Sequence, residues 1–227
     1  MLLQALAPDL WHIQHPLSIL GMRFSTRMTV VRLADHRLWL HSPIPISAEL
    51  AKELNALGEV AYIVAPSKMH HLFVPSAQAA FPRAQLFGAP GLHKKRPDLS
   101  GMQELTSALP TGMGPDLAHI CVQGIPIGNE TAWFHAPTQT LILTDLCQWW
   151  QGELAWNAAF YAWLTGVRKQ LVIPRSVRLM VKDKAAARAS AEQILRWPFV
   201  RVIVAHNCII EQNAKQAVVQ AFAALQA

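Results

Sequence analysis

Two short, largely apolar segments place the tightest limits on how this chain can fold. Val60–Ala65 reads VAYIVA and Val200–Ala205 reads VRVIVA, and both are rich in β-branched residues. Runs of roughly four to eight residues with this composition predict buried strands. Strands of this kind occur where helices cover both faces of a sheet. The chain should therefore contain at least one sheet with both faces covered.

The composition agrees with a thick core. The 227 residues are 52% hydrophobic and only 15% charged, which is too apolar for a disordered chain. The formal net charge of +6 is compatible with nucleic acid or an anionic surface as a partner. The lysines and arginines are nevertheless scattered, and the longest basic run is Lys94–Arg96. Nucleic-acid binding is therefore disfavoured.

The sequence favours a protein that is neither secreted nor inserted in a membrane. The first ten residues include Asp9 and lack the basic start of a signal peptide. No apolar run approaches the roughly 20 residues of a spanning helix. The three cysteines, Cys121, Cys147 and Cys208, fit no zinc-knuckle spacing and are odd in number. This favours free thiols in a reducing compartment, and we expect a cytoplasmic location without membrane contact.

Local periodicity and turn signals predict strands alternating with helices. Met28–Leu33 and Arg37–His41 should pair as a hairpin. Ser47 is a suitable N-cap for a helix through Leu57 that ends at Gly58. Further strands are expected at 85–88, 119–122, 132–135 and 140–144, helices at 76–81, 184–196 and 212–225, and a long loop over 90–115.

The order of these elements predicts the architecture. A β-rich part, a helix, a strand and a helix are followed by a second β-rich part, helices, a strand and a helix. Two such halves are compatible with an α/β (α+β) fold built as a four-layer αββα sandwich. Residues 1–227 should form one domain, with residues 1–27 as an N-terminal extension packed on it.

Residues able to bind a metal follow three of the predicted strands. His70 and His71 come after VAYIVA, Asp145 follows TLILT, and His206 follows VRVIVA. Loops at strand ends gather functional groups in α/β folds, and imidazole and carboxylate suit zinc, iron or manganese. A single histidine at a strand end is more often a hydrogen-bonded structural residue. The hypothesis of a metal site therefore depends on the agreement of three strand ends.

Five sequence blocks resemble, in order and spacing, a family of unknown function within the metallo-β-lactamase superfamily. They are RMTVVRL, RLWLHSPIPIS, IVAPSKMHHLFV, NETAWFHAPTQTLILTDL and VIVAHN. The resemblance extends from about Met28 to the C-terminus. It implies the αββα sandwich and, for the superfamily at large, a hydrolase site with two metal ions.

The resemblance also implies that part of the ligand set is lost. The superfamily has His-x-His-x-Asp-His after a strand, where this chain has PSKMHH. Pro66 and Lys68 stand at the first two ligand positions, and neither suits a metal. His70 stands where the superfamily has aspartate, and His71 matches the final histidine.

The resemblance leaves one of the two metal positions intact. Asp145 matches the bridging aspartate and His206 matches the last histidine. The other metal lacks its first two ligands, and its mid-chain histidine has no clear counterpart, although Glu130 and His135 lie near that region. The resemblance thus implies a single-metal site, for zinc, iron or manganese, whose ligands are His70, His71, Asp145 and His206.

A metal at this site would support hydrolysis of an ester, amide, thioester or phosphodiester in a small-molecule substrate. Asp145 would orient the attacking water, and Glu130 would orient the ligands or shuttle a proton. Lys68 would place an ammonium near the vacated metal position and replace part of the lost positive charge.

Two alternatives stay open at this point. In the first, the polar cluster holds no metal, and the protein is a catalytically inactive ligand- or partner-binding relative. In the second, the protein is a nuclease, which the missing ligands disfavour because such enzymes usually use two metals. A Trp-rich surface is also a candidate for a homodimer contact. Its residues are Trp149, Trp150, Trp156 and Trp163.

Overall fold

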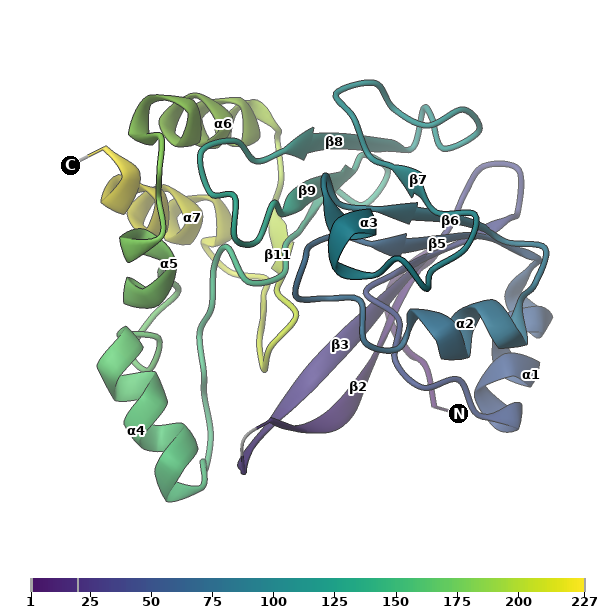
Figure 1. Cartoon of the computed structure of the whole chain (residues 1–227), viewed down its shortest axis with the longest axis horizontal. Coiled ribbons are helices and arrows are strands. Elements are labelled where there is room, and N and C mark those ends of the chain that lie inside the picture. The colour runs from purple at the N-terminus through teal and green to yellow at the C-terminus, as the bar shows by residue number, and fades with distance from the viewer. Residues whose placement is uncertain (1, 20, 227) are drawn as a thin grey trace.

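A seven-stranded sheet forms the N-terminal half of the molecule (Figure 1). The computed structural model describes residues 2–19 and 21–226, and its strands β1 to β7 lie side by side in chain order. Strands β1 to β4 pair antiparallel, whereas β4 to β7 pair parallel. The strands are β1 (Gln4–Ala7), β2 (Leu10–Ile19), β3 (Met22–Arg32), β4 (Leu38–His41), β5 (Val60–Ala65), β6 (Gln85–Gly88) and β7 (Gln103–Glu104).

A second sheet of five strands is arranged in the order β12-β11-β10-β9-β8. β10 and β11 run parallel and the other neighbours run antiparallel. The carboxyl ends of β10 and β11 therefore lie at the same edge of the sheet. The strands are β8 (Leu117–Cys121), β9 (Thr131–His135), β10 (Thr140–Ile142), β11 (Arg201–Ile203) and β12 (Ile209–Ile210).

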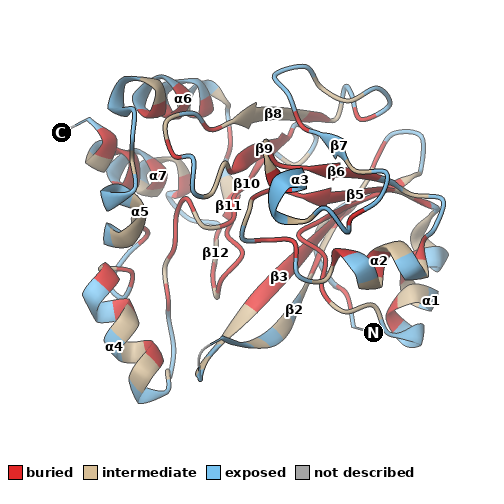
Figure 2. Ribbon diagram, viewed as in Figure 1, coloured by how far each residue is buried: buried red, intermediate tan, exposed pale blue. Residues whose placement is uncertain are grey.

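Helices cover the outer face of each sheet, so that the layers follow the order helix, sheet, sheet, helix, as predicted. Leu50 and Val74 pack α1 and α2 onto the seven-stranded sheet. Ile194 and Phe222 pack α6 and α7 onto the five-stranded sheet. Figure 2 shows the central strands, such as β5, β9 and β10, buried and the helices exposed on their outer sides. The helices are α1 (Ala48–Leu57), α2 (Val74–Ala80), α3 (Leu92–Lys95), α4 (Trp156–Thr165), α5 (Arg175–Leu179), α6 (Lys184–Arg196), α7 (Ala214–Phe222) and the 3-10 helix η1 (Ala223–Leu225).

The two sheets pack face to face through aromatic side chains. Trp39 of β4 and Trp133 of β9 are fully buried, and their rings meet edge to face with centroids 5.0 Å apart. Tyr62 and Phe87 extend this contact across the seven-stranded sheet. Aromatic pairs in such geometry add about 0.5–1.5 kcal/mol beyond the area they bury. This contact sets the spacing between the sheets and thus between the strand ends that each sheet contributes.

Helix α1 forms where its cap signals predict it. The Ser47 hydroxyl oxygen accepts a hydrogen bond from the Leu50 amide at 3.2 Å, and the Gly58 amide donates to the Leu54 carbonyl at 3.1 Å. Gly58 has extended backbone rather than the left-handed conformation usual at a helix end. A Cβ at Gly58 would lie 2.2 Å from the His36 carbonyl oxygen. A glycine is therefore required at this position, because the turn that contains His36 lies too close to leave room for a side chain.

The segment predicted as an N-terminal extension, residues 1–27, contributes strands to the seven-stranded sheet. Within the described residues of this segment, β1 and β2 are strands of the sheet, and the expected boundary at residue 27 falls inside β3. β2 pairs with β3 over ten consecutive residue pairs, from Leu10–Val31 to Ile19–Met22. β2 has few β-branched residues and contains a proline, so its strand conformation depends on pairing with β3 and not on local propensity.

Several smaller differences concern short elements. The loop expected over 90–115 contains α3 and β7, and the final helix begins at Ala214 rather than at residue 212. Helix α5 and strand β12 have no counterpart in the predicted element order. Among the helices of the described chain, none has the length and apolar character needed to cross a bilayer.

Candidate metal centre

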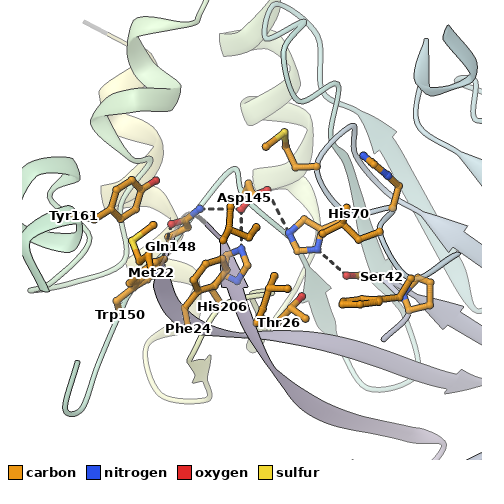
Figure 3. A pocket seen from close by; sticks show the side chains of 17 residues that line it. Met22, Phe24, Thr26, Ser42, His70, Asp145, Gln148, Trp150, Tyr161 and His206 are labelled. Carbon is orange, nitrogen blue, oxygen red and sulfur yellow. Dashed lines mark hydrogen bonds and ion pairs between the residues drawn. The ribbon is translucent and has the colours of Figure 1, made fainter. Parts of the chain in front are cut away.

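Three of the predicted metal ligands converge at one point between the two sheets (Figure 3). His70 follows β5, whereas Asp145 and His206 follow the parallel strands β10 and β11. Their nearest donor atoms all lie within 4.8 Å of one another. The two carboxylate oxygens of Asp145 divide between the imidazoles, since Oδ1 lies 3.1 Å from His206 Nε2 and Oδ2 lies 3.3 Å from His70 Nε2.

In each imidazole, Nδ1, the nitrogen that does not face Asp145, makes a hydrogen bond of its own. His206 Nδ1 lies 2.8 Å from the backbone oxygen of Ser25, and His70 Nδ1 lies 2.7 Å from the Ser42 hydroxyl. Because a carbonyl oxygen only accepts, Nδ1 of His206 carries the hydrogen of its bond. This contact fixes the ring so that Nε2 faces Asp145. Metal-bound histidines are oriented in the same way, by a hydrogen bond from the nitrogen that does not bind the metal.

The electrostatics of the cluster favour an ionised Asp145. Burial opposes ionisation, but His70 and His206 outweigh it and hold the pKa of Asp145 well below its usual range. Burial likewise lowers the pKa of His206, yet its hydrogen bond to Asp145 and the charge of that carboxylate raise it above its ordinary value. Gln148 Nε2 donates to Asp145 Oδ1 at 2.9 Å and fixes the carboxylate plane. The Asp145 side chain remains 23% exposed, so a ligand can reach it.

The Glu130 carboxylate accepts hydrogen bonds from the backbone around Asp145. One carboxylate oxygen accepts from the Thr144 amide at 2.6 Å, and the other accepts from the amides of Asp145 and Leu146 at 2.7 and 2.8 Å. Burial and the charge of Asp145 raise the pKa of Glu130, while the hydrogen bonds from backbone amides oppose the shift. Both oxygens are occupied, so this geometry suits positioning of the Asp145 loop and not the proton shuttle considered from the sequence.

His71 is close to the cluster in sequence but is not part of it. Among the described residues, the group with converging donor atoms consists of His70, Asp145 and His206. His71 Nδ1 lies 2.9 Å from a guanidinium nitrogen of Arg96. Burial, together with Lys95 and Arg96, lowers the pKa of His71 to about 4, so its imidazole is neutral. His71 contributes to the wall of the cavity at the cluster.

Lys68 does not fill the position that the sequence suggested for it. Its ammonium donates to the Pro126 carbonyl at 3.1 Å and lies beside Gly91. It is absent from the lining of the cavity at Asp145. Pro66 contributes its carbonyl to the Thr131 amide, which ties β5 to β9. Both residues that replace ligands of the superfamily pattern thus have contacts of their own.

Three groups of the site were missed from the sequence, namely Ser42, the Ser25 carbonyl and Gln148. Ser42 could have been found, because it directly follows the strand Leu38–His41 and so obeys the same strand-end rule as His70. The Ser25 carbonyl belongs to β3, whereas the strand predicted there began only at Met28. A backbone carbonyl also leaves no residue pattern by which it could be predicted from the sequence. Gln148 lies three residues after Asp145, in a segment without regular periodicity.

The donor set fits a divalent transition metal. Two imidazole nitrogens and one carboxylate suit zinc, iron or manganese, and three protein ligands leave coordination positions for water or substrate. The rings of Phe24 and Trp150 lie 5.2 and 6.2 Å from that of His206 and shield it from bulk water. The structure therefore contains a candidate site for one metal ion.

The layer order of helix, sheet, sheet and helix is that of the metallo-β-lactamase fold. Residues 8–94 match the family described as "Domain of unknown function (DUF4336)". The predicted resemblance to a family of unknown function agrees with this match, which covers residues 8–94, and the predicted sandwich is confirmed by the arrangement of the two sheets. The sequence has no match among the curated proteins.

Solved structures of other proteins match the fold of this chain over nearly its whole length. A metallo-β-lactamase from Erythrobacter litoralis is 11% identical, with a TM-score of 0.67 over 99% of this chain and 96% of that chain. A metallo-β-lactamase from Pontibacter korlensis is 10% identical, with a TM-score of 0.66 over 99% and 98%. A metal-soaked flavodiiron core from Synechocystis sp. is 12% identical, with a TM-score of 0.65, and this chain spans 60% of its length. At such identities the likeness establishes the fold alone.

Proposed function

We propose that this protein is a metal-dependent hydrolase with a single divalent ion held by His70, Asp145 and His206. One observation carries the proposal. The Ser25 carbonyl fixes one hydrogen of His206 on Nδ1, so whenever the ring is neutral its Nε2 turns a lone pair toward an Asp145 oxygen 3.1 Å away. Two facing acceptors repel each other unless a proton or a cation lies between them. A cation that attracts both groups would relieve this repulsion.

Each side chain around the candidate metal centre would have its own role in the proposed reaction. A divalent ion bound here would polarise a carbonyl or phosphoryl oxygen and lower the pKa of a water molecule. Asp145 would orient that water, while Gln148 keeps the carboxylate aligned. Glu130 would hold the Asp145 backbone. We assign His71 to the cavity wall and give Lys68 no catalytic role.

Thermal unfolding in the presence of zinc, iron(II) or manganese tests the proposal. A metal at about one hundred times its Kd stabilises the folded state by about 2.7 kcal/mol, so the Tm should rise and fall back on chelation. We expect H206Q to lose this rise. H71Q is the matched control and should keep it, because His71 is bound by Arg96. No rise with any of the three metals, or an equal rise in H206Q, would reject the proposed site, and loss of the rise in H71Q would return His71 to the ligand set.

A metal-free binding protein is the second candidate, and the raised pKa of His206 favours it. A protonated His206 satisfies Asp145 directly, and the chain of contacts from Ser42 through His70 and Asp145 to His206 is then complete without an ion. Absence of metal stabilisation, combined with saturable binding of a small molecule next to Asp145, would favour this function over hydrolysis.

We retain a cytoplasmic location as part of the proposal. The three cysteines are free thiols in the structure, and burial raises the pKa of Cys147 and Cys208. Such unreactive, unpaired cysteines are typical of a reducing compartment. Fractionation of the native host cells, with a cytoplasmic and a secreted marker, would test the location.

A further inference from the structure

Two separate cavities open beside Asp145, and they differ in lining. The first, which we call the aromatic cavity, has a volume of about 200 Å³ (Figure 3). Its apolar wall includes Met22, Phe24, Leu72, Phe73 and Trp150. The second, which we call the aliphatic cavity, has a volume of about 270 Å³. Its apolar wall includes Val122, Ile125, Ile127, Leu146, Val177 and Met180.

The two cavities border the same side chains at the candidate metal centre. Met69, Asp145, Gln148 and Tyr161 line both of them. Asp145 is therefore flanked by apolar space on two sides. Taken together, the two volumes fall within the range of about 300–1,000 Å³ that is usual for small-molecule pockets. An elongated ligand could lie across Asp145 with one end in each cavity.

The charges of the lining restrict the ligand further. Within the described chain, neither cavity is lined by a lysine or an arginine, and the aliphatic cavity has no histidine. In the aromatic cavity His71 is neutral, and His70 and His206 already contact Asp145. A carboxylate or phosphate group in either arm would therefore lose water without gaining an ion pair, which is costly. A cationic arm would find no free carboxylate, because Glu130 is bound by backbone amides and Asp145 by imidazoles.

From these features we infer that the substrate is an uncharged, elongated carboxylic ester or amide, with its carbonyl at Asp145 and an apolar group in each cavity. The inference deepens the proposed function and rests on it for the hydrolytic step. In an ester, the water oxygen bonds to the acyl carbon while the acyl–oxygen bond breaks. One proton of the water passes to the departing alcohol, and the other is released when the carboxylic acid product ionises.

The second cavity also explains how products would separate. The acyl part and the alcohol or amine part of the substrate would lie in different cavities, which have four lining residues in common. Cleavage at Asp145 leaves each product in its own cavity.

Binding of ketones tests the inference without requiring catalysis. Dibutyl ketone has an uncharged carbonyl between two apolar arms and cannot be hydrolysed. Isothermal titration of the full-length protein, loaded with zinc or chelated, should show saturable binding of dibutyl ketone. Methyl butyl ketone, with one arm, should bind at least about tenfold more weakly, because it buries three methylene groups fewer. Octanoate should bind more weakly still.

Variants at each cavity localise the two arms. Met22 and Met180 lie at partly exposed positions of the two cavities, so a glutamate at either place is tolerable for folding. M22E and M180E should each weaken dibutyl ketone binding by about tenfold or more through the cost of placing a charge against an apolar arm. L179E is the matched control, since Leu179 is 86% exposed next to Met180 but lines neither cavity. It should bind like the wild type.

The outcomes separate this inference from the proposed function. Equal binding of dibutyl ketone by M180E, M22E and wild type, or stronger binding of octanoate, overturns the two-cavity substrate. Binding as expected in a protein that gains no stability from metals and hydrolyses no dialkyl ester overturns the hydrolase but supports the ligand class. Metal stabilisation without ketone binding overturns the ligand class alone.

Discussion

At the scale of single residues, the Glu130 carboxylate fixes the backbone that carries the Asp145 carboxylate. Glu130 accepts hydrogen bonds from three consecutive backbone amides, including that of Asp145. These contacts fix the turn in which β10 ends and direct the Asp145 side chain toward the imidazoles. A buried carboxylate with three such donors is a strong interaction, because hydrogen bonds to a charged group are about twice as strong as neutral ones.

We therefore expect E130Q to destabilise the fold by about 2–3 kcal/mol, the cost of a buried amide facing another donor. A glutamine presents one oxygen and one NH2 group, so at least one of the three amides loses its acceptor. Urea denaturation measures the change, and the zinc-dependent rise in Tm should shrink as well. E153Q is the control, because Glu153 is exposed. Equal midpoints for the two variants would contradict this role of Glu130.

The sequence predicted which residues follow the strands but not where each side chain points. His70 and His71 are adjacent, and both follow β5, yet only His70 faces Asp145 while His71 contacts Arg96. Arg96 lies 25 residues further along the chain, and no local sequence pattern predicts its contact with His71. Lys68 was placed by analogy with a ligand position, and the Pro126 carbonyl that binds it lies 58 residues away along the chain. Strand ends are predictable from local sequence, whereas contacts between loops depend on the assembled fold.

At the scale of elements, β3 of one sheet holds the loop that carries His206 in the other. The Arg27 guanidinium donates to the carbonyls of Asn207 and Cys208 at 3.0 and 3.2 Å. Arg27 is only 3% exposed, and burial lowers its pKa to about 10, so it is still charged at neutral pH. The same strand supplies the Ser25 carbonyl to His206 itself. Two contacts from β3 thus fix both the ring and the backbone of this ligand.

R27M removes these donors while keeping an apolar stem in the sheet. We expect a loss of about 2–3 kcal/mol in unfolding free energy, since two hydrogen bonds from a charged donor disappear. The affinity for zinc should fall as well, because the residues directly after His206 lose their support. R23M on the same strand is the control, as Arg23 is exposed. Unchanged zinc affinity in R27M would show that the Ser25 contact suffices to hold His206.

Elements with strong local signals were predicted well, and those formed by pairing were not. Helix α1 has its cap and its stop within the sequence of the helix, and β5 has a compact apolar run. By contrast, β2 contains Pro16 and two histidines and gains its conformation from β3. β12 has only two residues and exists because it pairs with β11. Local propensity decides the first kind of element, and long-range hydrogen bonding decides the second.

At the scale of the whole molecule, helix α4 presents an exposed apolar face. Trp156, Phe160 and Trp163 are 83%, 58% and 67% exposed and recur at helical spacing, while Ala158 and Ala162 face inward. Trp150, which the sequence grouped with this surface, is instead buried at the candidate centre. Large exposed apolar faces mark interaction sites. A homodimer through α4 therefore stays a prediction of this structure.

Sedimentation velocity over a range of protein concentrations tests the dimer. We expect a concentration-dependent shift from monomer to dimer that W163E abolishes, because a symmetric contact would place two added charges in one interface. V219E is the control, since Val219 is 46% exposed on α7, away from this face. A wild-type protein that is monomeric at every concentration would reject a dimer of this kind.

The pH dependence of stability is a property of the whole fold, to which histidines far from the candidate centre contribute. Burial lowers the pKa of His135 to about 4, against the opposing effect of Asp116 and Asp9. Burial and the charge of Arg27 lower the pKa of His12 to about 4 as well. Both values lie below the ordinary histidine pKa of about 6.5, so between these limits the unfolded chain binds more protons than the folded one.

Stability should therefore rise with pH from about 4 to about 6.5, and be lost as the pH falls through this window. Each of these two histidines contributes up to about 1.4 kcal/mol per pH unit there. Urea midpoints measured across the window should show a shallower slope for H135Q than for the wild type. T138A is the control, because it removes the hydroxyl 2.7 Å from His135 Nδ1 but keeps the titrating ring. It should lower stability and keep the slope. Parallel curves for H135Q and wild type would show that His135 does not resist protonation in the folded state, and that acid sensitivity arises elsewhere in the molecule.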